Sequence, residues 1–499
     1  MDIYSILEKE VFMISQKLLE ARKWEEENSA LIDSSKRPFF HLSSRIGWMN
    51  DPNGFSEYND ETHLFYQYFP YKSVWGPMHW GHAVTKDYVK WDYRSVALAP
   101  DSKADEGGCF SGSAVTLEDG RHMLMYTGVV PVDGEENKYT QSQCLAFGDG
   151  ETYSKYEANP VLDEKDLPEG LSKFDFRDPK MNKEKDGTYT CVIGGCKEDM
   201  DGRILLYRSI DGIKWEFVSV LAENNHRFGK MWECPDFFEL DGKKVLLCSP
   251  MNMVKDDEYS DGHGTLCLIG ELNEENKLVE ESNQTIDYGV DFYATQTLLA
   301  KDGRRIMVAW MQSWHTLYED REDLSWYGQV ILPRELTIKD GRLYQQPVKE
   351  IENYRTNKVE YNGVEVSYEC ELNGIAGRCN DMTLELDLKE SDAFLMKIAQ
   401  KEDSFISILY DKTSNELTFD RSNLDGRKTS IDVRSFRVRK QSDILKMRIL
   451  IDKYSLECFI NDGEQAFTIT YDANIENKDI SFSANGTAKL NIVSYTLEV

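Results

Sequence analysis

Hydrophobic and polar residues alternate in short runs over most of the chain, a pattern typical of β-strands joined by polar turns. Five runs resemble one another, because each begins with aspartate, in four of them as Asp-Gly, and continues into an apolar strand. They are DETHLFYQYFP from Asp60, DGRHMLMYTGV from Asp119, DGTYTCVIGGC from Asp186, DGKKVLLCSPM from Asp241 and DGRRIMVAWMQ from Asp302. Asp-Gly supplies the positive φ angles of a tight turn, so each run is predicted to be a β-hairpin.

The hairpins recur with spacings of 59, 67, 55 and 61 residues. A second marker, an aspartate followed four positions later by an aromatic residue, keeps this period at Asp87, Asp149 and Asp211. No helical pattern of useful length lies between the hairpins. Because radial repetition of four-stranded sheets builds a β-propeller, five units predict a five-bladed β-propeller over residues 38–345. The alternative is a β-sandwich whose hairpins resemble one another by chance.

Both ends of the chain depart from this period. Beyond residue 357 the repeat stops, and the alternating segments of residues 346–499 predict a C-terminal antiparallel β-sandwich. Residues 1–37 are predicted to form a helical extension that packs on a later domain, because apolar residues recur mostly every three or four positions. These residues are Ile3, Leu7, Phe12, Ile14, Leu18 and Leu19. The expected fold class is therefore all-β with a short N-terminal helical extension.

Charge and cysteine content narrow the classes of partner. The 499-residue chain has 58 Lys plus Arg against 88 Asp plus Glu, a net charge of −30, which argues against nucleic acid or an anionic membrane. No apolar run approaches a membrane span, and the N-terminus does not read as a secretion signal. The ten cysteines are widely spaced without a CxxC motif, which favours reduced thiols in a cytoplasmic protein. The sequence leaves the oligomeric state open.

Polar residues occupy matching places in the repeat. Ser111, Asp178 and Glu233 each precede their hairpin aspartate by 8 residues, Asp51 precedes its own by 9, and Asp291 by 11. The first strand of each propeller blade lines the central channel, so these five positions are predicted to converge on one pocket.

Several carboxylates in one pocket repel one another, which costs stability unless chemistry or counter-charges justify the arrangement. Arg177, next to Asp178, is the available compensating cation. Each motif alone also has a structural interpretation: DPNG is a common turn, RDP is short, and WECPDF fits a core tryptophan before an edge strand. Their shared position in the repeat favours a functional site.

Histidine and aromatic residues complete the candidate chemistry. His79 and His82 in HWGH are three positions apart, so on a strand they face opposite sides and do not share a metal ion. Aromatic residues cluster around the motifs, where aromatic faces and carboxylates together match a sugar ring; packing between blades is the structural alternative. These residues are Trp48, Trp75, Trp232, Tyr293 and Trp310.

The ordered blocks WMNDPNG, FYQY with WGPMHWGH, FSGS, FRDP, WECPDF and DFYATQ resemble the signature blocks of glycoside hydrolase family 32. This family comprises invertases, sucrose-6-phosphate hydrolases and fructanases. PREL with QQPVKE, and LECFINDGE in the tail, are similar to its later blocks, so the resemblance covers residues 38–499. The family's fold, a five-bladed propeller followed by a β-sandwich, agrees with the repeat.

The resemblance implies that Asp51 is the nucleophile, Glu233 the general acid/base, and Asp178 the carboxylate that binds fructose hydroxyls and stabilises the transition state. Other residues occupy positions that contact the fructosyl unit in the family: Asn50, Gln67, Trp75, Phe110, Ser111, Arg177, Tyr293 and Trp310. The implied reaction releases fructose from terminal β-D-fructofuranosides with retention, through two carboxylates about 5 to 5.5 Å apart. It requires no metal and no cofactor, and the partner is a small saccharide.

Three alternatives stay open from the sequence. An inverting five-bladed glycosidase of the arabinanase or xylosidase type would use more widely spaced carboxylates. A sugar-binding protein would keep the pocket without the chemistry. A fructosyltransferase or fructanase of the same family would share every residue named. Sucrose, sucrose 6-phosphate and short fructo-oligosaccharides are the expected substrates, and a long fructan is less expected for an intracellular enzyme.

Overall fold

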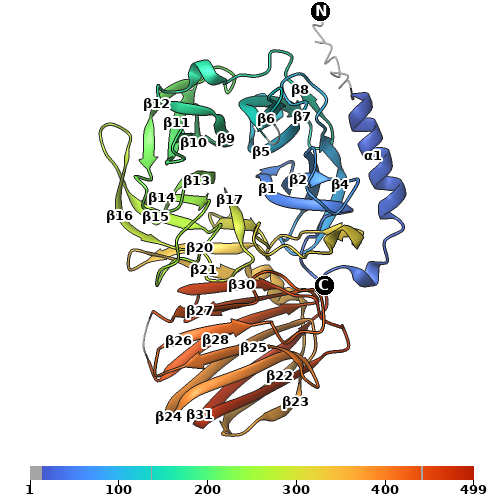
Figure 1. The fold of residues 1–499 in the computed structure, drawn as a ribbon, viewed down its shortest axis with the longest axis vertical. Helices are drawn as coiled ribbons and strands as arrows, with labels where there is room; N and C mark the ends of the chain where they lie inside the picture. Colours follow the sequence, from blue (N-terminus) through green and yellow to red (C-terminus); the bar gives the residue numbers. More distant parts are fainter. Residues whose placement is uncertain (1–13, 136–137, 440–441) are drawn as a thin grey trace, which may run out of the picture.

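The computed structural model describes residues 14–135, 138–439 and 442–499, which form a helix, a β-propeller and a β-sandwich (Figure 1). Helix α1 (Gln16–Ser29) lies along the outer edge of the first blade. Ser15 caps its N-terminus by accepting a hydrogen bond from the Leu18 amide. Arg22 donates to the carbonyl of Val96 at that blade edge, 2.9 Å away. The helix is thereby fastened to the propeller.

Part of the predicted extension is confirmed as a helix. Leu18 is buried, whereas Leu19, which shared the apolar pattern, is 46 % exposed. Ile3, Leu7 and Phe12 lie outside the described residues. No helix among the described residues is long and apolar enough to cross a bilayer. Over the described ranges, connections contain four short 3-10 helices: η1 (Ser34–Lys36), η2 (Glu164–Asp166), η3 (Arg321–Asp323) and η4 (Lys349–Tyr354).

The predicted five-bladed propeller is confirmed, and each blade is a four-stranded antiparallel sheet. Blade I contains β1 (Gly47–Tyr58), β2 (Glu61–Phe69), β3 (His79–Thr85) and β4 (Trp91–Leu98). Blade II contains β5 (Gly108–Thr116), β6 (His122–Pro131), β7 (Tyr139–Gly148) and β8 (Tyr153–Lys155). Blade III contains β9 (Leu171–Lys183), β10 (Tyr189–Lys197), β11 (Gly202–Ser209) and β12 (Glu216–Glu223). Blade IV contains β13 (Trp232–Leu240), β14 (Lys243–Pro250), β15 (Leu266–Leu272) and β16 (Leu278–Gln284).

Blade V completes the ring and is tied back to blade I. It contains β17 (Tyr293–Leu299), β18 (Arg305–Trp310), β20 (Arg334–Lys339) and β21 (Arg342–Pro347). The short strand β19 (Trp326–Tyr327) pairs in parallel with the start of β1 and so joins the last blade to the first. The last blade strand ends two residues beyond the predicted domain boundary at 345.

The five Asp-containing turns join the first two strands of each blade, as the hairpin motif predicts. At the turn between β13 and β14, for example, Asp241 has φ 49° and Gly242 has φ 80°. The first strand of every blade (β1, β5, β9, β13 and β17) is consequently the innermost one, and these strands surround the propeller axis (Figure 1).

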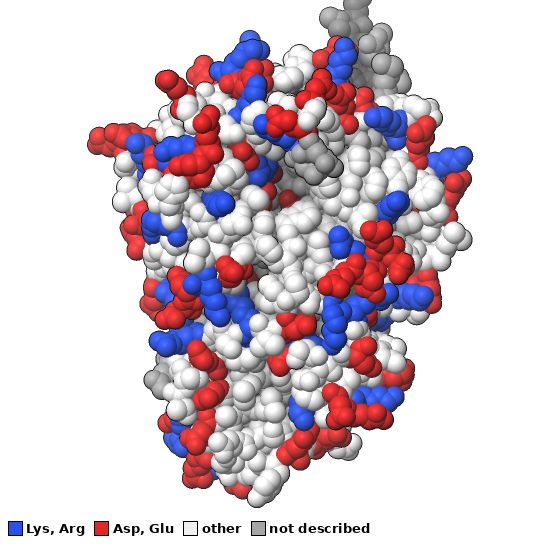
Figure 2. Space-filling view, in the orientation of Figure 1, with Lys and Arg blue, Asp and Glu red and all other residues white. Residues whose placement is uncertain are grey.

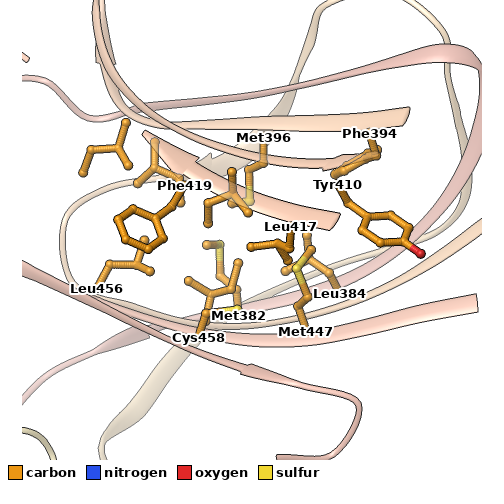
Figure 3. Close-up of a cluster of buried hydrophobic side chains, with 14 of the residues drawn as sticks. Met382, Leu384, Phe394, Met396, Tyr410, Leu417, Phe419, Met447, Leu456 and Cys458 are labelled. Carbon is orange, nitrogen blue, oxygen red and sulfur yellow. The ribbon is translucent and has the colours of Figure 1, made fainter. Parts of the chain in front are cut away.

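The predicted C-terminal sandwich is also confirmed, as ten antiparallel strands around one hydrophobic core (Figure 3). Two long strands, β24 (Asn380–Lys401) and β31 (Asp479–Leu497), pair along most of their length and are bent by several bulges. The other strands are β22 (Arg355–Val366), β23 (Cys370–Ala376), β25 (Ser404–Asp411), β26 (Glu416–Asp420), β27 (Val433–Arg437), β28 (Ile444–Asp452), β29 (Ser455–Ile460) and β30 (Gln465–Thr470).

A fully buried ionic network joins the sandwich to the propeller. The imidazole of His41 lies 2.7 Å from Asp452 and 2.9 Å from Glu457, both on the sandwich. Arg334 of blade V binds the other oxygen of Glu457 at 2.6 Å and Asp287 at 2.9 Å. Burial alone lowers the pKa of His41, but the hydrogen bonds and charges of Asp452 and Glu457 outweigh burial and raise that pKa to about 9.

This junction makes a pH-dependent prediction. A histidine whose pKa rises on folding stabilises the protein fully below its unfolded pKa of about 6.5, and this stabilisation is lost as the pH rises through about 9. A shift of that size corresponds to about 3 kcal/mol. We expect His41→Gln to lower the free energy of unfolding at pH 6 by roughly that amount and by much less at pH 10.

The measurement is urea unfolding at both pH values. His226, which is exposed, provides the matched control, and His226→Gln should retain the native pH dependence. An equal destabilisation by His41→Gln at pH 6 and pH 10 would contradict a charged His41 at the junction.

Candidate active site

A cavity of about 770 Å³ opens at the centre of the propeller and is lined by residues of all five blades. Figure 2 shows the propeller face hollowed near its centre, with charged residues of both signs scattered around it. Nine of the eleven predicted site residues line this cavity: Asn50, Asp51, Gln67, Trp75, Phe110, Arg177, Asp178, Glu233 and Tyr293. The structure therefore brings together residues that are up to 243 positions apart in the sequence.

Asp51 lies on β1, where neutral donors hold its carboxylate. Ser111 donates a hydrogen bond of 2.7 Å and Gln67 one of 3.2 Å to Oδ2, while Asn50 donates one of 3.0 Å to Oδ1. Burial raises the pKa of Asp51, the Ser111 hydrogen bond lowers it, and the negative charge of Glu233 raises it further. The pKa of Asp51 is raised overall, and the hydrogen bonds limit that rise by stabilising the ionised form.

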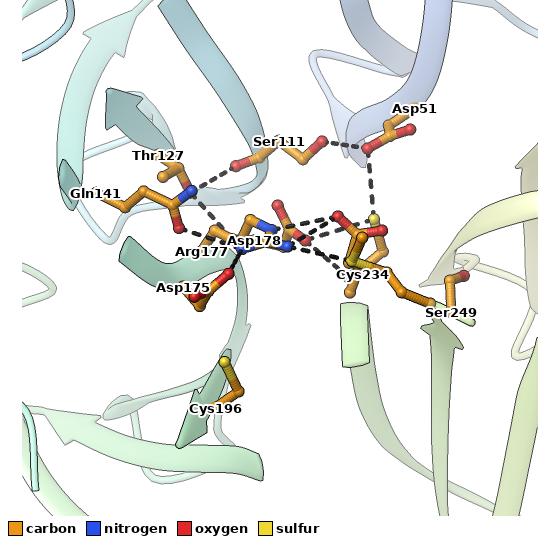
Figure 4. Close-up of polar contacts among 12 residues, drawn as sticks. Asp51, Ser111, Thr127, Gln141, Asp175, Arg177, Asp178, Cys196, Cys234 and Ser249 are labelled. Carbon is orange, nitrogen blue, oxygen red and sulfur yellow. Dashed lines mark hydrogen bonds and ion pairs between the residues drawn. The ribbon is translucent and has the colours of Figure 1, made fainter. Parts of the chain in front are cut away.

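Asp178 lies on β9 and faces Asp51 across the cavity (Figure 4). Its Oδ2 accepts a 2.9 Å hydrogen bond from the Cys234 amide, and its own amide donates to Thr127. Burial raises the pKa of Asp178, the Arg177 charge opposes the rise, and Glu233 adds to it. Burial and the negative charge of Glu233 therefore both favour the protonated form of Asp178.

Glu233 lies on β13 between a cation and a phenol. Arg177 donates to Oε1 from Nη2 at 3.1 Å and from Nε at 3.2 Å, and the Tyr293 hydroxyl donates to Oε2 at 2.6 Å. Arg177 also contacts Asp175 at 3.0 Å. Burial alone lowers the pKa of Arg177, but the surrounding carboxylates, Glu233 first, raise it overall, so this guanidinium remains charged. The predicted compensating cation is therefore in place.

Irregular backbone aims these side chains at the propeller axis. In each of the five inner strands the register with the neighbouring strand shifts at the level of the cavity. In β1 the shift falls between Met49 and Pro52, around Asp51, and in β13 it falls between Glu233 and Asp236. A β-bulge of this kind turns side chains out of the regular alternation. Non-glycine residues with positive φ lie at three of these sites: Asp178, Cys234 and Ala294.

Cys234 is a site residue that sequence reasoning missed. Its Sγ lies 3.5 Å from Oδ2 of Asp51 and 3.7 Å from Oδ2 of Asp178, so one thiol contacts both acids. Its position directly after Glu233 was the available signal, because the bulge turns both neighbours toward the axis. The thiol is buried, and burial followed by the neighbouring carboxylates raises its pKa, so the sulfur stays protonated and can donate.

Asp291 does not face the cavity, and the prediction that it does is wrong. It precedes β17 and is fully buried against the sandwich, where it binds Arg421 at 2.5 Å and accepts from the Thr470 amide at 2.6 Å. Its spacing of 11 residues from the hairpin, rather than 8 or 9, already placed it ahead of the inner strand. Tyr293 occupies the blade V position instead.

Two of the predicted contact residues lie behind the cavity wall. Trp310 is fully buried and packs edge-on against Trp48 and Trp314, at ring distances of 5.9 and 5.3 Å, so direct substrate contact is corrected to a supporting position. Trp314, four residues further on, lines the cavity. Ser111 is 2 % exposed and acts on the site through its hydrogen bond to Asp51.

Ten further cavity residues were missed: five lie on connections between strands, which carry no periodic pattern, and five lie on β7 or near the start of β9. They are Lys138, Tyr139, Gln141, Ser172, Phe174, Asp175, Glu198, Met251, His263 and Trp314. His79 and His82 do not meet: His82 is hydrogen-bonded to His63, and His79 to the carbonyl of Pro77. Within the described part of the chain, no group of three or more His, Cys, Asp or Glu side chains is arranged to hold a metal ion.

A substitution at Ser111 tests the electrostatics around Asp51. Ser111→Ala removes the closest donor to this carboxylate, so we expect kcat/KM to fall about 10- to 100-fold. Without the donor the pKa of Asp51 rises, so the acid limb of the pH profile should move to higher pH. Ser113, on the same strand, accepts from the Met181 amide outside the site, and Ser113→Ala should leave the limb in place. If the acid limb of Ser111→Ala did not move, Ser111 would have no effect on the ionisation of Asp51.

Three carboxylates, an arginine and aromatic rings converge on one propeller cavity, and together this fold and site define a glycoside hydrolase. The "Glycosyl hydrolases family 32 N-terminal domain" matches residues 41–347 and the "Glycosyl hydrolases family 32 C terminal" matches residues 350–498. The chain belongs to glycosyl hydrolase family 32, and it is a glycosidase.

Several relatives are similar over nearly their whole length. The chain is 36 % identical to a sucrose-6-phosphate hydrolase of Escherichia coli, covering 91 % of this chain and 93 % of that protein. It is 34 % identical to a raffinose invertase of Escherichia coli, covering 96 % and 98 %. A Bombyx mori beta-fructofuranosidase variant in complex with sucrose has 34 % identity and a TM-score of 0.83, with coverage of 97 % and 99 %.

Proposed function

We propose that this glycosidase cleaves terminal β-D-fructofuranosides and releases fructose with retention of configuration. The observation that carries the proposal is the convergence of Asp51, Asp178 and Glu233 on one cavity, from three different blades. Asp51 is held by neutral donors, whereas Glu233 is held by Arg177 and Tyr293, so the two carboxyls have different environments. Such a difference is what separates a nucleophile from an acid/base.

The reaction proceeds in two displacements. Asp51 attacks the anomeric carbon C2 of the fructosyl unit while Glu233 transfers a proton to the leaving oxygen. Water then attacks the fructosyl-enzyme ester, and Glu233 takes the proton back as a base. Asp178 accepts hydrogen bonds from fructose hydroxyls as positive charge develops on the ring. Trp75 and Phe110, 5.9 Å apart and nearly perpendicular, offer apolar faces to the sugar.

Sucrose, sucrose 6-phosphate and short fructo-oligosaccharides are the proposed substrates. The names of the Escherichia coli relatives and the sucrose complex of the Bombyx mori protein support this range. The test is a hydrolysis panel of sucrose, sucrose 6-phosphate, kestose and inulin at equal concentration. We expect sucrose or its 6-phosphate to be cleaved faster than inulin. Failure to release fructose from all four would overturn the proposed function.

We also propose a cytoplasmic location. All ten cysteines are free thiols, eight of them buried, which supports a reducing compartment. Fractionation of the producing cells should recover the sucrose-cleaving activity with cytoplasmic markers. Recovery of the activity in the external medium of intact cells would contradict this location.

A further inference from the structure

The connection between β18 and β19, residues 311–325, reaches the cavity through Trp314, which His315 follows directly. Trp314 lines the cavity and stacks on Trp48, with ring centroids 5.9 Å apart and planes inclined by 23°. His315 fits against Gly262 of blade IV, where a Cβ would lie 2.7 Å from the imidazole. Gly262 also has φ 90°, a conformation that favours glycine, so a side chain here would strain the backbone and displace the His315 ring.

His315 is connected to Glu233 through two residues, His263 and Tyr293. The imidazoles of His315 and His263 share a hydrogen bond of 2.7 Å, and His263 lines the cavity. The His263 ring packs edge-on against Tyr293, 5.4 Å away. The Tyr293 hydroxyl lies 2.6 Å from Oε2 of Glu233, to which it donates, and 2.9 Å from the Ser249 carbonyl. Burial lowers the pKa of His263, the negative charge of Glu233 opposes this, and His315 adds to the lowering. The net lowering favours the neutral imidazole, and a bond between two imidazoles requires a neutral acceptor ring.

The sandwich also contacts this connection. Its loop of residues 421–432, between β26 and β27, places the Ser430 hydroxyl against the backbone carbonyl of His315, to which it donates. Arg427 of the same loop binds Asp320 at 3.2 Å. The sandwich thus contacts the cavity wall at two places on one blade V connection.

The loop is itself firmly anchored. Arg421 at its base is 3 % exposed and binds Asp291 of the propeller at 2.5 Å. The same guanidinium donates to the Thr429 hydroxyl and to the carbonyl of Ile431, both at 2.8 Å. Hydrogen bonds from a charged donor such as this guanidinium are stronger than bonds between neutral groups. Arg421 therefore holds the residues on both sides of Ser430 in place.

We propose that the C-terminal sandwich positions the general acid: Ser430 holds His315, which through His263 keeps Tyr293 against Glu233. The inference rests on the proposed function, and it gives the sandwich a part in leaving-group protonation. Ser430, His315 and His263 are positioning residues, because they act on Glu233 through Tyr293.

The test compares two substrates that differ in their need for an acid. Sucrose needs protonation of its leaving oxygen, whereas β-D-fructofuranosyl fluoride loses fluoride without it. We expect His315→Phe to lower kcat for sucrose about 10-fold and Ser430→Ala about 3-fold, with less than about a 2-fold change for the fluoride. His315→Gln, which keeps a side-chain hydrogen bond, should recover most of the sucrose activity.

Ser435→Ala is the matched control, because Ser435 is exposed like Ser430 and its hydroxyl pairs with Thr418 of the neighbouring sandwich strand. Ser435→Ala should leave kcat unchanged for both sucrose and the fluoride. Equal losses on both substrates in His315→Phe and Ser430→Ala would indicate general disturbance and overturn the proposal, as would unchanged sucrose turnover. If the unmodified protein cleaves neither substrate, the proposed function fails and this inference fails with it.

Discussion

Asp51→Ala should lower kcat for sucrose by about five orders of magnitude, because without the carboxylate no fructosyl-enzyme ester forms. Sucrose should still bind, since the aromatic faces of Trp75 and Phe110 and the charge of Arg177 remain. The measurements are single-turnover kinetics and isothermal titration with sucrose.

Azide distinguishes a lost nucleophile from a damaged site. It can enter the space left by the Asp51 carboxylate and attack the anomeric carbon of β-D-fructofuranosyl fluoride once, from the opposite face. We therefore expect azide to restore turnover of the fluoride by Asp51→Ala and to give the α-fructosyl azide. Near-normal sucrose turnover by this variant would show that Asp51 is not the nucleophile.

Glu233→Ala should lower kcat for sucrose by about three to four orders of magnitude, because the glucosyl oxygen then leaves without a proton. The substitution also frees Arg177 and Tyr293 from their shared partner. Turnover of β-D-fructofuranosyl fluoride should fall far less in the first step, since fluoride needs no acid.

The two variants have opposite signatures with azide. In Glu233→Ala the nucleophile is intact, so azide should attack the fructosyl-enzyme and give the β-fructosyl azide. Glu239, on the same strand but bound to Lys244 at the surface, supplies a control, and Glu239→Ala should retain native turnover. Equal losses on sucrose and on the fluoride in Glu233→Ala would contradict the role of Glu233 as the acid.

The repeat in the sequence predicted the fold because hairpin turns have strong local signals. Asp-Gly turns recur where the first two strands of a blade meet, and counting back one strand placed Asp51, Asp178 and Glu233 on the inner strands. The same count failed for Asp291, because its extra residues carry it off the strand and into contact with Arg421. Local spacing does not report a partner 130 residues away.

The site residues that the sequence did not reveal depend on tertiary contacts. His263 and Trp314 lie on connections whose positions are set by Gly262, Trp48 and the sandwich, and no period marks them. The family resemblance predicts that Trp310 contacts the fructosyl unit. In the structure Trp310 is fully buried and packs against Trp314, so it supports the cavity wall instead of contacting substrate.

The central claim is that Asp51 and Glu233 act on one fructosyl unit from a shared cavity by double displacement. Sucrose cleavage in water containing methanol tests this claim directly, because methanol traps the fructosyl unit as a stable glycoside. NMR of the first product should show methyl β-D-fructofuranoside, the result of two inversions at C2. Methyl α-D-fructofuranoside as the first product would mean a single displacement and would contradict the account.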